Sequence, residues 1–189
     1  MKTTEKLSIC LVLIINFYFL LIICNYWKAD IYFNSQEFEK ALTITPDEPN
    51  FVAKLAFKNG SVETAFKAYK LNPYNQNTRR ILISNLVSSN NLEVAEEVIL
   101  DGTHQSPNDP KLFYQLGILQ LKIGKNEEAI KSLEKSIELK SNYKEGRFAL
   151  GATYKALKEN FKAKEQFEYI LKNIDPNDEL TKKYLEEVK

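Results

Sequence analysis

The chain has 189 residues, of which 44% are hydrophobic and 27% charged, a balance typical of one folded domain with an appendage. Its 26 Lys and Arg residues nearly match its 25 Asp and Glu residues, so the formal net charge is +1. A protein that binds nucleic acid through its phosphates needs a cationic surplus, and this balance therefore argues against a nucleic-acid partner.

The first element in the chain is an uncharged apolar segment, residues 7–27. A helix needs about 20 apolar residues to cross the hydrocarbon core of a bilayer, and this segment has that length. It ends in Tyr26 and Trp27, whose amphipathic rings favour the headgroup region. The pattern predicts a single transmembrane helix, with residues 1–28 forming a short stub and the anchor.

The flanks of this segment bear on its cleavage and its orientation. A cleaved signal peptide usually ends in small residues, whereas the candidate site here begins with Trp27, so an uncleaved anchor is favoured and cleavage stays open. Lys2 and Lys6 precede the segment, and basic flanks tend to stay in the cytoplasm. We therefore expect a single-pass membrane protein with a cytoplasmic N-terminus and extracytoplasmic repeats.

Residues 29–75 are expected to form shortened repeat helices. Pro46 and Pro73 are 27 residues apart, seven fewer than the interval of 34 that dominates the rest of the chain. Seven residues make about two helical turns. The loss of one turn from each helix of a pair would keep both apolar faces in phase.

From Pro73 onward, two kinds of residue recur at a fixed interval. A proline or serine returns every 34 or 35 residues, at Pro73, Pro107, Ser141 and Pro176. Alanine returns every 34 residues, at Ala95, Ala129 and Ala163. Apolar residues within 110–123 and 127–139 have helical spacing, and the turn Gly124-Lys125-Asn126 separates them. No stretch shows sustained strand alternation, so the predicted fold is all-α.

The repeats resemble the tetratricopeptide-repeat (TPR) family, whose pattern is W-x2-L-G-x2-Y, then A-x3-F, then P. Two copies carry most of this pattern: Leu116, Gly117, Ala129 and Leu133 in one, and Leu150, Gly151, Tyr154, Ala163, Phe167 and Pro176 in the next. The resemblance implies an α-solenoid of antiparallel helix pairs, with repeats at 76–109, 110–143 and 144–177.

The end of such a stack needs a cap with a polar outer face. Residues 178–189 are expected to be a capping helix, with Asp178 as its N-cap. The inward-facing residues are expected to be Leu180, Tyr184, Leu185 and Val188.

Residues that carry catalysis are scarce. His104 is the single histidine, in a stretch expected to be a solvated loop between repeats, and both cysteines, Cys10 and Cys24, lie in the apolar segment. A phosphate-binding loop, a nucleophile elbow and a zinc-binding His motif are all missing from the sequence. We expect no enzymatic activity, no cofactor, no metal and no small-molecule substrate.

The TPR resemblance implies a groove lined by the first helix of each repeat. Carrying the groove positions over residue by residue predicts a peptide-binding site at Arg80, Ser84, Tyr114, Ile118, Leu121, Lys122, Phe148 and Lys155. An apolar centre with cations at the rim favours an acidic or C-terminal segment of a protein partner. The apolar side chains could instead complete the packing of the helices, and both interpretations stay open.

Two functions fit these features. The first is a membrane-tethered, non-catalytic scaffold for protein–protein interaction. The second is an accessory component of polysaccharide assembly in the bacterial cell envelope, because the anchor, residues 27–32, Pro49 and the repeats resemble the C-terminal tail of some O-antigen ligase-type proteins. Those enzymes need many membrane helices, and this chain would carry the tail without the catalyst.

Overall fold

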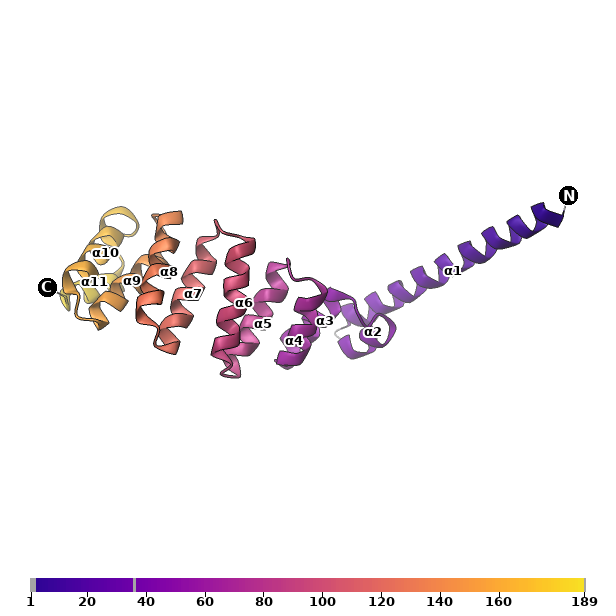
Figure 1. The fold of residues 1–189 in the computed structure, drawn as a ribbon, viewed down its shortest axis with the longest axis horizontal. Helices are drawn as coiled ribbons and strands as arrows, with labels where there is room; N and C mark the ends of the chain where they lie inside the picture. Colours follow the sequence, from indigo (N-terminus) through magenta and orange to yellow (C-terminus); the bar gives the residue numbers. More distant parts are fainter. Residues whose placement is uncertain (1–2, 36, 189) are drawn as a thin grey trace. The chain divides into compact units, whose positions relative to one another are not determined.

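The computed structural model describes residues 3–35 and 37–188, in which all regular structure is helical (Figure 1). Two residues used in the predictions lie outside the described residues. They are Lys2, one of the basic residues from which the membrane orientation was predicted, and Lys189, the last residue of the expected capping helix. The chain divides into two compact units, Met1–Asn85 and Leu86–Lys189. The predicted all-α fold is confirmed, and each unit is built from antiparallel helix pairs.

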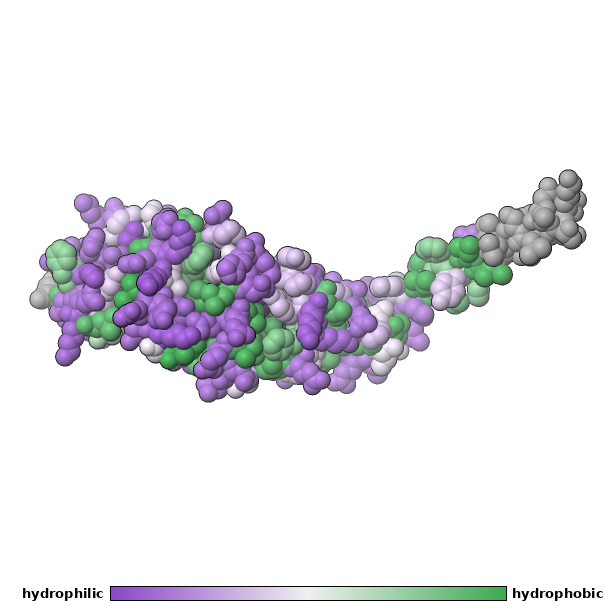
Figure 2. All heavy atoms as spheres, viewed as in Figure 1, coloured by the Kyte–Doolittle hydropathy of each residue, from purple (hydrophilic) through white to green (hydrophobic). Residues whose placement is uncertain are grey.

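The N-terminal unit begins with one long helix. Its elements are α1 (Thr3–Asn34), α2 (Phe38–Ile44), α3 (Pro49–Asn59), α4 (Val62–Leu71) and most of α5 (Gln76–Ser88), in which the division between the units falls. Within α1, Ile14–Asn34 is long and apolar enough to cross a membrane by length and composition. Figure 2 shows mainly hydrophobic side chains along the coloured part of this helix.

Helix α1 does not end where the apolar segment ends. It continues through Asn34, because residues 28–34 contain no Gly or Pro that would stop it. Ala29 is fully buried against Ala41 and Phe51, and the rings of Phe33 and Phe51 stack with centroids 4.5 Å apart. The last turns of α1 thus pack as a repeat helix, and the expected boundary between residues 28 and 29 falls inside a helix.

The next pair of helices is shorter than the pairs that follow it. Helices α3 and α4 have 11 and 10 residues, whereas α7 (Pro110–Ile123) and α8 (Asn126–Leu139) have 14 each. The difference of seven residues accounts for the proline interval of 27 instead of 34. One turn is lost from each helix, and the fully buried Ala65 and Ala68 keep the apolar face of α4 toward its neighbours.

The C-terminal unit stacks full-length pairs. Its elements after α5 are α6 (Leu92–Gln105), α7, α8, α9 (Lys144–Ala156), α10 (Asn160–Asn173) and α11 (Glu179–Glu186). A Cβ on Gly117 would lie 2.7 Å from Cγ of Leu133, and one on Gly151 would lie 2.7 Å from Cε1 of Phe167. Glycine is needed at both positions because a large side chain of the second helix occupies the space beside it. The recurring alanines, Ala95, Ala129 and Ala163, are fully buried.

Four of the described turns inside helix pairs contain a residue with a left-handed conformation. Gly60 and Gly124 have φ of 66° and 88°, while Asn90 and Lys158 have φ of 60° and 62°. Glycine adopts this conformation without the steric cost that a Cβ brings. The four positions are equivalent in the repeat, so two turns have the favourable residue and two do not.

The capping helix α11 begins as predicted, with the Asp178 side chain accepting a hydrogen bond from the Thr181 amide at 3.0 Å. Val188 is buried, but Leu180 is 53% exposed and Thr181 is fully buried in its place. The expectation for Leu180 was wrong because the inward face follows the spacing 181, 184, 185 and 188. Leu180 lies one residue, or about 100°, away from that face.

Candidate peptide-binding grooves

A groove of about 690 Å³ opens on the C-terminal unit between α7, α9 and the start of α11. This C-terminal groove is lined mainly by apolar side chains: Tyr114, Ile118, Leu121, Phe148, Ala149, Ala152, Leu157 and Leu180. Its polar lining includes Lys144, Glu145 and Asp178. Four of the predicted site residues, Tyr114, Ile118, Leu121 and Phe148, therefore come together.

The groove exists because α7 is apolar on two faces. Leu112, Leu116 and Leu119 are buried in the core. Tyr114 and Ile118 lie four residues apart on another face, where they line the groove and Ile118 is 40% exposed. A helix that needed only one partner face would carry polar residues at these positions.

The aromatic members of the lining are held by the core. Phe148 packs against Phe167 and Tyr184, with ring centroids 5.7 and 5.0 Å away, and the Tyr114 ring meets that of Tyr143 edge-on at 5.5 Å. Burial raises the pKa of the Tyr114 hydroxyl, and the carboxylate of Glu145 raises it further. Tyr114 therefore stays a neutral hydrogen-bond donor at physiological pH. The rings of Tyr114 and Phe148 pack against neighbouring rings and also line the groove. Helix packing and peptide binding, the two roles considered from the sequence, therefore do not exclude each other.

The predicted cations lie differently from the apolar residues. Lys122 is exposed and Lys155 is half-buried, and neither is part of the groove lining. Lys155 forms an ion pair with Glu187, and its Nζ lies 4.3 Å from the centroid of the Tyr184 ring. The structure thus uses the charge of Lys155 to hold the cap.

One cation that was not predicted from the sequence, Lys144, is part of the lining of the C-terminal groove. Its Nζ lies 2.8 Å from Oδ2 of Asp175 and also pairs with Asp178. Hydrogen bonds to these carboxylates raise the pKa of Lys144, and the same bonds lower the pKa of Asp175 and of Asp178.

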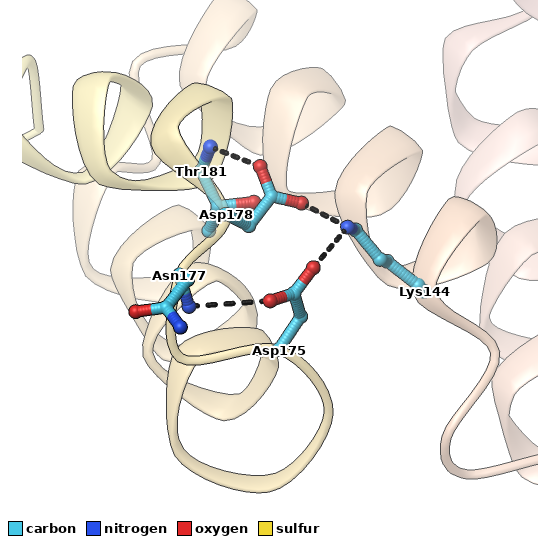
Figure 3. Close-up of polar contacts among 5 residues, drawn as sticks. All are labelled: Lys144, Asp175, Asn177, Asp178 and Thr181. Atoms are coloured by element: carbon cyan, nitrogen blue, oxygen red, sulfur yellow. Dashed lines mark hydrogen bonds and ion pairs between the residues drawn. The ribbon is translucent and has the colours of Figure 1, made fainter.

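This cluster ties three segments together. Asp175 also accepts a hydrogen bond from the Asn177 amide at 3.2 Å, and Asp178 caps α11 through the Thr181 amide (Figure 3). Lys144 thereby links the start of α9 to the turn before α11. This link keeps Leu180 at the end of the groove. In the sequence it is visible only as two acidic residues that follow Lys144 by 31 and 34 positions.

The remaining predicted site residues, Arg80 and Ser84, line a second hollow in the N-terminal unit. This N-terminal hollow has a volume of about 690 Å³ and is formed by α1, α3, α5 and the turn before α5. Its lining is rich in Phe and Asn and includes three charges: Asp30, Phe33, Asn50, Phe51, Ala53, Lys54, Phe57, Asn75, Asn77, Thr78, Arg80, Ile81 and Ser84. The lining residues from α1 and α3 were not predicted as site residues, because those helices lack the Leu-Gly pair by which the later repeats are recognised.

His104 and Cys24 have side chains of the kind that act in catalysis or bind metal ions. His104 is exposed as predicted, but it lies in the last turn of α6 instead of a loop, because the buried Gly102 and Thr103 continue the helix. Cys24 is exposed on α1. The described residues contain no group of three or more His, Cys, Asp or Glu side chains that could hold a metal ion.

Stacked antiparallel helix pairs, small residues at their contacts and first helices that line a groove are the features of a TPR-like helical-repeat fold. In agreement, residues 110–143 match the family model of the tetratricopeptide repeat. None of the curated proteins matches the chain.

Solved structures of TPR proteins share the fold. MamA of Desulfovibrio magneticus RS-1, from residue 41 to its end, is 17% identical with a TM-score of 0.65, over 83% of this chain and 97% of that chain. YrrB, a TPR protein with an unusual peptide-binding site, is 21% identical with a TM-score of 0.61, over 80% and 81%. The first TPR of Spaghetti (RPAP3), bound to the HSP90 peptide SRMEEVD, is 19% identical with a TM-score of 0.52, over 56% and 83%. At these identities the likeness establishes a TPR-like α-solenoid fold.

Proposed function

We propose that the protein is a membrane-tethered scaffold that holds a protein partner by a peptide segment in the C-terminal groove and catalyses no reaction. The observation that carries the proposal is the second apolar face of α7, which lines a groove instead of the core. Exposed Ile118 and Leu180 at this groove would lose contact with water when a partner covers them.

The similar structures support a peptide partner. One is bound to a peptide and another has a peptide-binding site, and both share the TPR-like fold of this chain. A groove lined by successive first helices presents apolar anchor positions at regular intervals, which suits an extended or helical peptide. None of the three structures is described as a polysaccharide-assembly protein, so the alternative function gains no support.

The groove chemistry indicates which residues the partner would present. Lys144 and Lys155 are paired with carboxylates of this chain, so they add little net positive charge to the rim. Apolar and aromatic partner side chains would therefore supply most of the affinity, at the centre of the groove. Exposed Lys122, next to Leu121 of the lining, would favour an acidic partner residue at the edge and mainly affect the association rate.

The tether is proposed from α1. Its apolar stretch has the length of a membrane span, and the basic residues before it favour a cytoplasmic N-terminus with the repeats on the other side. The C-terminal groove would then serve partners outside the cytoplasm.

Site-specific photocrosslinking tests the groove in membranes of cells that express the full chain. A photoreactive amino acid in place of Ile118 should crosslink to a protein that the same amino acid in place of Val94 does not reach. Val94 is a matched control because it is 37% exposed, close to the 40% of Ile118, and lies on α6 outside the groove. A second change, Ala152→Glu in the lining, should abolish the crosslink from position 118. Equal crosslinking from both positions, or no effect of Ala152→Glu, would show that the groove is not the binding site.

A further inference from the structure

The N-terminal hollow has a chemistry and a position that the C-terminal groove does not share. We propose that it binds the juxtamembrane segment of a second membrane protein, one that carries acidic and aromatic side chains directly after its own membrane span. This inference rests on the proposed insertion of α1 in a membrane, and it names a partner for a site other than the C-terminal groove.

The position follows from the continuity of α1. The uncharged segment ends at Trp27, which is expected in the headgroup region, so Asp30 and Phe33, in the last turns of the Ile14–Asn34 stretch, are expected beyond the hydrocarbon core on the same unbroken helix. At about 1.5 Å per residue, Asp30 lies about 5 Å and Phe33 about 9 Å beyond Trp27 along the helix axis. A ligand of the hollow must therefore approach along the membrane surface. A segment attached to a membrane span is held at that depth, which raises its effective concentration there.

The floor of the hollow is aromatic. Phe33 and Phe51 stack on each other, and Phe51 is buried. Phe57 of α3, also in the lining, is 71% exposed. This exposure is not explained by membrane insertion, because Phe57 does not belong to the apolar segment of α1. Covering such a ring removes a large apolar area from water, so an aromatic or aliphatic partner side chain fits this floor.

The charges of the hollow favour an acidic segment. Lys54 and Arg80 contribute two cations to the lining, against the single carboxylate of Asp30. Arg80 is oriented by a hydrogen bond from its Nη2 to Oδ1 of Asn77 at 2.8 Å, which leaves its other donors for a carboxylate.

The position of Asp30 favours a peptide over a lipid. Among the lining residues of α1 it is the one nearest the apolar segment, and its carboxylate repels a lipid phosphate that approaches from the headgroups. A peptide can place a neutral or basic residue beside Asp30 and an acidic residue beside Lys54 and Arg80. A phosphate group offers only negative charge.

Trp27 provides a local probe for the test because it is the single Trp of the chain. The full chain is reconstituted in phosphatidylcholine vesicles with a synthetic single-span peptide whose Trp-free tail carries Glu and Phe and a dansyl group. Energy transfer from Trp27 to dansyl reports occupation of the hollow. A matched peptide with Lys in place of Glu is the comparison. We expect the Glu tail to bind about fivefold more tightly, as two solvent-exposed charge pairs would allow.

Charge reversal localises the effect. The double change Lys54→Glu with Arg80→Glu should remove or invert the preference for the Glu tail, while Lys131→Glu with Lys172→Glu in the C-terminal unit should leave it unchanged. All four side chains are exposed, so the folded state is retained. Equal transfer for the two tails, or an equal effect of the two double changes, would overturn the proposal. Competition by glycerol phosphate with no preference between tails would identify a lipid-headgroup site and overturn it as well.

Flotation of the vesicles separates this proposal from the proposed function. If the wild-type chain does not float with the vesicles, the tether is wrong and the inference falls with it. If the chain floats and the tails do not differ, only the partner of the N-terminal hollow is wrong, and the C-terminal groove is unaffected.

Discussion

The two units line similar hollows with different chemistry. In the N-terminal hollow, Lys54 and Arg80 lie beside aromatic rings and are not paired with a carboxylate in any contact that the structure shows. In the C-terminal unit, Lys144 and Lys155 are bound to carboxylates of the capping segment. The same architecture can thus leave cations for a partner or pair them with carboxylates of its own cap. Which of the two occurs depends on which carboxylates the fold brings near each cation.

The units also differ in how their helix pairs are joined. In the N-terminal unit, Nδ2 of Asn85 donates to the backbone oxygens of Ala56 and Ser61, at 3.1 and 3.2 Å. In the C-terminal unit, Gln120 donates to the carboxylate of Glu96 at 3.1 Å and accepts from Ser132 at 2.7 Å. Neutral groups make the first junction, whereas the second includes a buried carboxylate and is therefore expected to depend on pH.

The largest expected effect concerns the proposed tether, helix α1 of the N-terminal unit. Leu20→Arg places a charge inside the apolar segment, at a cost of about 2.5–3.5 kcal/mol for membrane insertion. We expect the variant to shift from the membrane to the soluble fraction by roughly a hundredfold in flotation assays. Leu157→Arg, at a partly exposed position of the C-terminal unit, should still float. Extraction of the wild-type chain by carbonate would contradict the tether.

The next effect concerns the close helix contacts. Ala129→Leu forces three extra carbon atoms into a fully buried position and should destabilise the C-terminal unit by about 1–3 kcal/mol. Ala65→Leu should do the same in the N-terminal unit, where the site is also fully buried. Urea unfolding measures both, with Lys131→Gln on the exposed face of α8 as the control. A leucine variant as stable as the control would mean that the helices do not approach closely there.

The two junctions can be compared by removing their amides. Gln120→Leu removes the acceptor of the buried Ser132 hydroxyl and a donor to the carboxylate of Glu96, at a cost of about 1–3 kcal/mol. Asn85→Leu removes two hydrogen bonds to carbonyls that still accept from the amides of Gly60 and Ala65, so we expect a smaller cost of about 0.5–1.5 kcal/mol per bond. Burial opposes the charged form of Glu96, but hydrogen bonds from Lys125 and Gln120 outweigh it and lower the pKa of Glu96. The cost of Gln120→Leu should therefore fall as the pH drops through the lowered pKa of Glu96 and its carboxylate takes up a proton, while the cost of Asn85→Leu stays constant. Identical pH profiles for the two variants would remove this difference between the units.

A smaller effect is expected at the left-handed turns. Lys158 has φ of 62°, a conformation that costs a non-glycine residue about 1 kcal/mol. Lys158→Gly should stabilise the C-terminal unit by about 0.5–1 kcal/mol, since part of the gain is offset by the greater freedom of glycine in the unfolded chain. Gly124→Ala, at the equivalent position of the preceding repeat, should have the opposite sign. Thermal unfolding measures both, and equal signs would contradict the shared turn geometry.

The smallest effect concerns the pH dependence of the cap. The pKa values of Asp175 and Asp178 are lowered in the folded state, so their contribution is present above about pH 4 and lost as the pH falls through their folded values. The pKa of Lys144 is raised, so its contribution is present below about pH 10 and lost only above that.

The variant Lys144→Met should therefore be less stable than wild type near pH 7, with the difference shrinking below pH 4. Lys172→Met, an exposed change on α10, should track wild type at every pH. A constant difference between Lys144→Met and wild type would show that the ion pairs contribute nothing to the cap.

The sequence by itself determined the repeat architecture. The interval of 34 residues, the small residues Ala129 and Gly117, and the turn at Gly124 predicted full-length helix pairs that the structure contains. These features could be predicted because helix periodicity, close contact and turn conformation depend on residues that are near in sequence. The apolar half of the candidate site, including Tyr114 and Ile118, was predicted from the groove positions that the resemblance to the TPR family implies.

Only the tertiary structure decided where helices end against neighbours and which charges are paired. It extended α1 to Asn34, because Ala29 finds a packed position against α2 and α3. It also placed Nζ of Lys125, a residue of an exposed turn, 2.6 Å from the buried carboxylate of Glu96, and bound Lys155 to Glu187. Each of these pairs spans about one repeat, 29 and 32 residues. Such contacts depend on how successive helices stack. The periodicity within one repeat does not determine which charged side chains of neighbouring repeats meet.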